Sequence, residues 1–83
     1  MSKPRQNPVF EKNERVIDTL GLTAREVQVL ELLAEGDSNT ELAKRLFVST
    51  STIKTHLLHL YQKLDVSRRT QAVQKAKSLE IIR

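Results

Sequence analysis

The chain has 83 residues, of which 39% are hydrophobic and 29% are charged, and it contains no cysteine. This length supports one hydrophobic core, and the lack of thiols excludes disulfides, thiolate zinc sites and a cysteine nucleophile. Apolar runs never exceed three residues, so the sequence offers neither a membrane span nor a signal-peptide core. We therefore expect a soluble, cytoplasmic domain.

The net charge of +4 is unevenly distributed along the chain. Residues 1–48 carry a net charge of −1 and residues 49–83 carry +5, and the pI is about 9.8. A basic excess in one half favours a polyanionic partner, nucleic acid rather than membrane, because no strongly apolar amphipathic face accompanies it. Charge alone fits a solvated basic surface equally well.

Residues 1–21 are predicted to form a tail or linker that carries a helix. The first seven residues are polar and predict a loose tail. Asn7 before Pro8 predicts a helix start, and the apolar residues between Phe10 and Leu20 share one face. Gly21 is expected to end this helix.

Two capping boxes mark the next helices, Thr23 with Glu26 and Ser38 with Glu41. The first predicts a helix over 24–35 that ends at Gly36, a suitable left-handed terminator, and the second predicts a short helix over about 39–46. The residues expected to face inward are Val27, Leu30, Leu33 and Ala34 in the first helix, and Leu42, Ala43 and Leu46 in the second.

Phe47 and Val48 are predicted to lie in a break, because Ser49 is the next N-cap candidate. A connection this short forces the following helix to cross the preceding helix at a steep angle. The spacing is typical of a helix-turn-helix.

The helix predicted over about 50–64 has two different faces. Its apolar stripe consists of Ile53, Leu57, Leu60 and Leu64, and its opposite side holds Ser51, Lys54, Thr55, Leu58 and Gln62. No Asp or Glu occurs from residue 42 to residue 64. A solvated face usually mixes both signs, whereas a surface that lies against phosphates and base edges lacks acids.

This face suggests specific contacts with duplex DNA. Lys54 is predicted to reach guanine O6 or N7, Thr55 either type of base edge, and Leu58 a thymine methyl. The predicted phosphate contacts are Thr50, Ser51 and Thr52 with the free amides of the first turn, and His59, Arg68 and Arg69. For the hydroxyls the alternative is helix capping, and Leu58 alone would be an ordinary exposed leucine.

No metal, cofactor or catalytic site is expected. His56 and His59 are three residues apart, but no nearby Cys, Asp or Glu supplies a third ligand. We expect His56 to be packed beside the core and hydrogen-bonded. The sequence offers no catalytic constellation and no glycine-rich phosphate loop, so we do not expect an enzyme.

A last helix is predicted over about 69–79, capped by Ser67 or Thr70. Val73, Ala76 and Leu79 recur at three-residue spacing within it. These small apolar residues either complete the core of the domain or pair with a symmetry mate.

Residues 22–82 resemble the LuxR-type (GerE-type) helix-turn-helix domain of bacterial transcription regulators. The resemblance rests on Leu22-Thr23-x-Arg25-Glu26, Glu41-Leu42-Ala43, Thr52-Ile53-Lys54-x-His56 and Tyr61-x-Lys63-Leu64. It implies an all-α, four-helix DNA-binding domain over residues 22–83, preceded by an additional helix or extended tail. It also implies that the helix over about 50–64 enters the major groove of a promoter or operator.

The resemblance assigns roles to the same residues. In this family the residues matching Lys54, Thr55 and Leu58 face the bases, and the threonine matching Thr52 contacts phosphate. The last helix serves relatives as the dimer contact, which implies a weak homodimer on DNA. The residues implied in that contact are Val73, Ala76 and Lys77.

Two residues depart from the family pattern. Relatives usually carry glycine at the position of Asp65, and Asn or Ser at the position of Arg68.

The competing hypothesis is a helical protein-interaction module that contacts RNA polymerase or another acidic protein. Its apolar anchor would then consist of Leu58, His59 and Tyr61.

Overall fold

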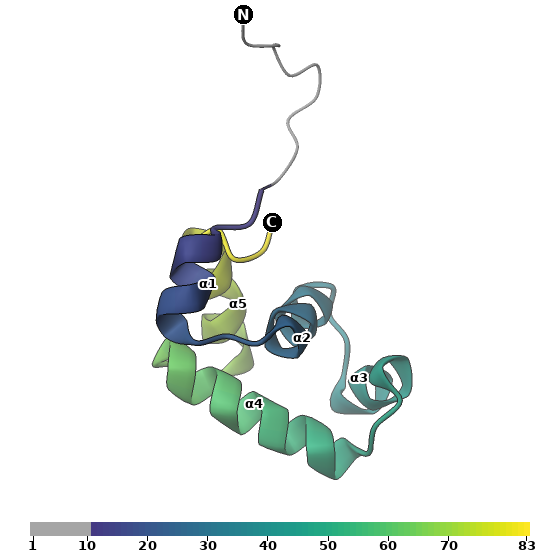
Figure 1. Cartoon of the computed structure of the whole chain (residues 1–83). Coiled ribbons are helices and arrows are strands. Elements are labelled where there is room, and N and C mark those ends of the chain that lie inside the picture. The colour runs from purple at the N-terminus through teal and green to yellow at the C-terminus, as the bar shows by residue number, and fades with distance from the viewer. Residues whose placement is uncertain (1–10) are drawn as a thin grey trace, which may run out of the picture.

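The computed structural model describes residues 11–83, and within this range the chain forms five helices and no strand (Figure 1). The predicted all-helical class, four helices preceded by an additional one, is confirmed. None of the helices in this range is long and apolar enough to cross a membrane. The helices are α1 (Glu14–Leu20), α2 (Ala24–Ala34), α3 (Asn39–Leu46), α4 (Thr50–Leu64) and α5 (Arg69–Ser78).

Helix α1 begins later than the sequence predicted. The Asn13 side chain accepts a hydrogen bond from the Val16 amide at 3.2 Å, so Asn13 caps the helix. Asn7, Pro8 and Phe10 lie outside the described residues. The predicted end is confirmed, because Gly21 has the left-handed conformation with φ 70°.

Both predicted capping boxes form. The Glu26 amide donates to Thr23 Oγ1 at 3.1 Å, and the Thr23 amide donates back to Glu26 Oε1 at 2.9 Å. Ser38 and Glu41 repeat this exchange at 3.2 Å and 2.8 Å. Each box satisfies two amides that helix geometry leaves without partners, and so fixes where α2 and α3 begin.

The turn between α3 and α4 is as short as the sequence predicted. Phe47 ends α3 in the left-handed conformation, with φ 58°, and Ser49 caps α4. The Val48 amide donates to the Ala43 carbonyl at 3.0 Å. This turn sets α4 at a steep angle to α3, the arrangement of a helix-turn-helix (Figure 1).

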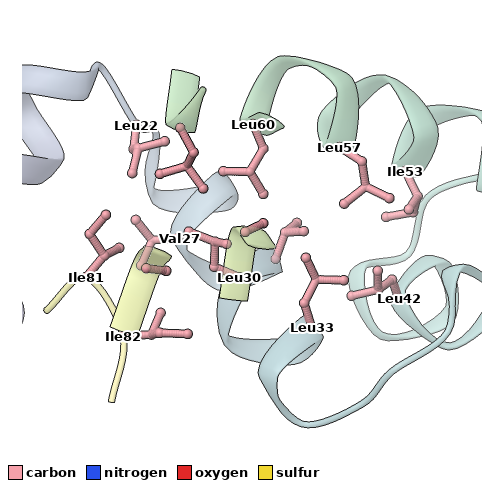
Figure 2. Close-up of a cluster of buried hydrophobic side chains, with 14 of the residues drawn as sticks. Leu22, Val27, Leu30, Leu33, Leu42, Ile53, Leu57, Leu60, Ile81 and Ile82 are labelled. Atoms are coloured by element: carbon pink, nitrogen blue, oxygen red, sulfur yellow. The ribbon is translucent and has the colours of Figure 1, made fainter. Parts of the chain in front are cut away.

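The core lies where α4 crosses α2 and α3. The predicted apolar stripe of α4 is buried, and Figure 2 shows Ile53 and Leu57 directed toward Leu33 and Leu42. Helix α2 packs against both α4 and α5. Burial of such side chains contributes about 1.5–3 kcal/mol each, which is the main force that holds α4 in place.

Two residues of α2 differ from the prediction. Ala34 was expected to face inward, but it is exposed, because it is the last residue of α2 and precedes the turn at Gly36. Val29 was not singled out, yet it is fully buried. Because α2 lies between α4 and α5, its buried face is wider than one stripe.

The two ends of the described chain are joined. The Asn13 amide donates to the Glu80 carbonyl at 2.9 Å, and Lys12 Nζ lies 3.0 Å from Glu31 Oε2. Ile81 and Ile82, which follow α5, are buried in the core. Helix α1 therefore lies beside the C-terminal end of α5 (Figure 1).

The start of α5 does not use the predicted caps, Ser67 or Thr70. Instead, Gln71 Oε1 accepts hydrogen bonds from the amides of Ser67 and Arg68, at 3.0 Å and 3.1 Å. Arg68 occupies the N-cap position, where its side chain has no acceptor to offer. The long glutamine side chain of the first turn reaches back and accepts from those amides instead.

Candidate nucleic-acid interface

Helix α4 presents a polar outer face to solvent, as the sequence predicted. None of the side chains on this outer face enters the core, and Leu58, the large apolar residue of the face, is 56% exposed. The buried stripe on the other side fixes the rotation of α4 about its axis, so the exposure of this face follows from core packing. The outer face of α4 consists of Ser51, Lys54, Thr55, Leu58, His59 and Gln62.

The N-terminus of α4 keeps free donors. Ser49 Oγ accepts from the Thr52 amide at 3.1 Å and so caps α4, and it also lies within hydrogen-bond distance of Thr52 Oγ1, at 3.0 Å. Within residues 11–83 the amides of Thr50 and Ser51 have no hydrogen-bond partner. Together with the helix dipole, these amides favour an anion at this end of α4.

Thr55 is partly committed to its own helix. Its hydroxyl donates to the Ser51 carbonyl at 3.2 Å. A hydroxyl that donates still has lone pairs with which to accept. In this conformation Thr55 presents an acceptor to a partner, which suits the amino group of adenine or cytosine.

Lys54 is the basic residue at the centre of this face. It is exposed, and it forms no ion pair within the described range. Lys63 is different, because its Nζ lies 2.8 Å from Glu26 Oε1 and 2.8 Å from the Gly21 carbonyl. The positive charge of Lys63 is therefore used inside the fold, whereas that of Lys54 is free.

The carboxyl of Glu26 is buried, with 4% of the residue exposed. Burial alone would raise the pKa of Glu26, but hydrogen bonds from Lys63 and from the Thr23 amide outweigh it, so the pKa lies below its usual value. Glu26 is thus ionised at neutral pH and neutralises Lys63.

The structure places five of the six predicted phosphate contacts in two groups, and the sixth, His59, lies between them on α4. Thr50, Ser51 and Thr52 lie at the N-terminus of α4, whereas Arg68 and Arg69 follow its other end (Figure 1). The two groups therefore do not form one cluster.

Arg69 has an internal role that the sequence did not reveal. Its guanidinium donates to the Asp37 carbonyl and to Asn39 Oδ1, both at 2.6 Å. It ties the start of α5 to the connection between α2 and α3, and the side chain is half-buried. Arg68 is exposed and remains available to solvent.

The two histidines occupy different environments. His59 is exposed on the outer face, and His56 is half-buried beside the core, as predicted. The expected hydrogen bond of His56 is not formed with any residue in the range 11–83. No group of three or more potential metal ligands occurs in that range either.

The three residues of α5 that were predicted to form a dimer contact differ in their exposure. Ala76 is fully buried, because α5 packs against α2 through Ala72 and Ala76. It is therefore a core residue, and its side chain is not accessible on the surface of this domain. Val73 is half-buried and Lys77 is exposed, so these two remain on the surface.

A short crossing from α3 to α4 and an exposed, acid-free outer face define a helix-turn-helix domain of the DNA-binding type. The comparison with known families agrees: residues 20–76 match the family described as bacterial regulatory proteins, luxR family. The chain belongs to this family. Its members are DNA-binding regulators of transcription. The match confirms the resemblance that the sequence motifs indicated.

Particular relatives support the same assignment. The chain is 52% identical over 64 residues to the HTH-type transcriptional regulator MalT of Yersinia pestis (strain Pestoides F) and of Serratia proteamaculans (strain 568). This match covers 77% of the chain but only 7% of MalT. The chain therefore corresponds to a small part of those regulators.

A solved structure is also similar. It is the response regulator ChrA of a heme-sensing two-component system, with a TM-score of 0.72 and 41% sequence identity. The similarity covers 96% of this chain and 33% of ChrA. The chain thus resembles one third of ChrA in fold as well as in sequence.

Proposed function

We propose that residues 22–83 are a sequence-specific domain for double-stranded DNA, with α4 in the major groove, and that residues 1–21 are a tail or linker that carries the helix α1. The observation that carries this proposal is the outer face of α4, which is exposed and free of carboxylates and begins at two unpartnered amides, those of Thr50 and Ser51. A face of this kind fits phosphates at its start and base edges along its length.

In this proposal Lys54, Thr55 and Leu58 read bases, and their exposure on one face supports the assignment. Lys54 donates to guanine, Thr55 accepts from an amino group, and Leu58 contacts a thymine methyl. Thr50 and Ser51 bind phosphate, with Arg68 at the far end of α4. Thr52 contributes to this contact through its hydroxyl, which lies 3.0 Å from the Oγ of the capping residue Ser49.

We further propose that two copies bind adjacent half-sites as a weak dimer in the cytoplasm. Val73 and Lys77 on α5 are the surface residues that support this contact. A two-fold arrangement of helix-turn-helix domains places the half-sites one helical turn apart or a multiple of it.

Selection from a random duplex pool tests the proposal. The expected result is an enriched sequence with a defined half-site, bound far more tightly than random duplex. The double variant Lys54→Ala/Thr55→Ala is expected to lose this preference while it retains the helical circular dichroism of the parent. Equal binding of selected and random duplex by the parent protein would overturn sequence-specific recognition.

Contact with RNA polymerase is the second candidate function. Its anchor would require Leu58, His59 and Tyr61 on one accessible surface, and Tyr61 is half-buried. Two results together would favour this candidate over the first. The double variant Lys54→Ala/Thr55→Ala would retain the full DNA affinity of the parent, and the protein would bind RNA polymerase through Leu58, His59 and Tyr61.

A further inference from the structure

Phe47 is the most exposed large apolar residue in the described part of the chain, with 94% of its surface accessible. It stands in the turn between α3 and α4, between the buried Leu46 and the half-buried Val48. Every other large hydrophobic residue of this range, except Leu58, is at least partly buried. The two exposed apolar side chains thus belong to the helix-turn-helix.

The fold itself does not use the ring of Phe47. The turn is closed by backbone hydrogen bonds, from the Phe47 amide to the Lys44 carbonyl and from the Val48 amide to the Ala43 carbonyl. Phe47 also has a positive φ of 58°, a conformation that glycine adopts without steric cost. Glycine would therefore build the same turn, and the ring needs another explanation.

The surroundings of Phe47 are positively charged. No acidic residue occurs between positions 42 and 64. Of the four basic residues there, Arg45 pairs with Glu35 and Asp37 and Lys63 pairs with Glu26, whereas Lys44 and Lys54 form no ion pair within residues 11–83. Lys44 is exposed, and the exposed Arg25 donates from Nη1 to the Leu46 carbonyl at 3.3 Å, which brings a further guanidinium next to the turn. An apolar ring among cations fits a polyanion that also offers apolar surface.

Duplex DNA has both properties. Its backbone is anionic, and its deoxyribose carbons and thymine methyl groups are apolar. Phe47 lies three residues before Thr50, the first residue of α4. When α4 lies in a major groove with its N-terminus toward the bases, the turn before it lies at the edge of that groove.

We propose that Phe47 is a DNA-contacting residue that packs against a deoxyribose or a thymine methyl at the edge of the major groove. This inference rests on the proposed function. It adds an apolar contact outside the outer face of α4, and it explains why the turn keeps an aromatic residue where its backbone favours glycine.

The test compares Phe47→Gly and Phe47→Leu with the parent protein on a fluorescent duplex recovered from the random pool. Phe47→Gly is expected to lose about 10-fold in affinity, the factor that corresponds to roughly 50–60 Å² of apolar surface no longer buried. Phe47→Leu is expected to retain part of the contact. Thr19→Ala on α1, at the opposite end of the molecule, is the control and is expected to bind as the parent does (Figure 1).

Thermal unfolding shows whether a loss reflects the fold. Glycine suits the positive φ, so Phe47→Gly is expected to melt no lower than the parent. A second arm replaces every thymine of the duplex with uracil, which lacks the methyl group. A smaller effect of Phe47→Gly on that duplex identifies the methyl as the contact, and an unchanged effect identifies the sugar.

The remaining outcomes overturn the inference in distinguishable ways. If the parent binds the selected duplex and Phe47→Gly binds it equally well, Phe47 does not contact DNA, although the proposed function stands. Loss of promoter-dependent transcription in that case would assign the ring to a protein partner. If the parent binds no duplex at all, the proposed function fails, and this inference fails with it.

Discussion

Lys63 Nζ, in the last turn of α4, lies 2.8 Å from Glu26 Oε1, in the first turn of α2. The same ammonium group donates to the Gly21 carbonyl at 2.8 Å, where α1 ends. One side chain therefore connects three helices, and it does so at the end of α4 opposite to Thr50 and Ser51. Core packing and this ion pair together hold the outer face of α4 in one orientation.

Removing Lys63 is expected to destabilise the fold. Lys63→Ala leaves the buried carboxylate of Glu26 without its partner, at a cost of about 2 kcal/mol in the free energy of unfolding. This cost is below that of a fully buried pair, because the Lys63 side chain is 32% exposed and partly screened. Urea denaturation measures it. Lys54→Ala, which removes an exposed and unpaired lysine, is the matched control and is expected to leave stability unchanged.

Stability is expected to fall in acid. Burial raises the pKa of Glu26, but hydrogen bonds from Lys63 and Thr23 outweigh this, and the pKa is lowered from 4.5. The pKa of Glu41 is also lowered, because the Ser38 amide and hydroxyl hydrogen-bond to its carboxylate. A carboxyl whose pKa is lower in the folded state stabilises the fold above its unfolded pKa, and this contribution is lost as the pH falls through the folded value.

The melting temperature should therefore be nearly constant from neutral pH to about pH 5 and should decrease at lower pH. Glu26→Gln is expected to melt lower at neutral pH and to depend less on pH in the acidic range. An acid profile identical to that of the parent would show that Glu26 does not contribute to this dependence.

Asp65→Gly is expected to stabilise the domain. Asp65 ends α4 with φ 57°, a left-handed conformation that costs a residue with a side chain about 1 kcal/mol relative to glycine. The gain is therefore about that size, and it should appear as a higher melting temperature. Asp65→Ala separates conformation from charge, because alanine tolerates positive φ less well than aspartate and should lower the melting temperature.

Lys54→Ala is expected to weaken binding to the selected duplex by about 1–3 kcal/mol, with a much smaller loss on random duplex. Equal losses on both duplexes would mean that Lys54 contacts phosphate. In that case the slope of log affinity against log salt would also decrease by about 1. Fluorescence anisotropy titrations between about 50 and 200 mM salt measure both quantities.

Much of the fold was predictable because its signals are local. The capping boxes at Thr23 and Ser38, and the cap at Ser49, predicted three helix starts, since the partners lie within one turn. The apolar stripe of α4 likewise predicted which side faces outward. The exposed members of the candidate site follow from that stripe alone.

The features that the sequence did not predict concern residues whose partners are distant in the sequence. Arg69 bonds to Asp37 and Asn39, about thirty positions away, and nothing near Arg69 indicates this. Ala76 is buried because α5 packs on α2, and spacing alone did not distinguish a core face from a dimer face. Phe47 was correctly predicted to lie in a break between two helices. The exposure of its ring was not predicted, because it depends on how α3 and α4 cross.

The hydrogen bond between the Asn13 amide and the Glu80 carbonyl also has a practical consequence. Both ends of the described chain emerge together, on the side of the molecule away from α4 (Figure 1). A fusion partner, fluorophore or surface tether attached at either end would therefore leave the outer face of α4 unobstructed. Immobilised protein would present that helix outward, whichever end carries the linkage.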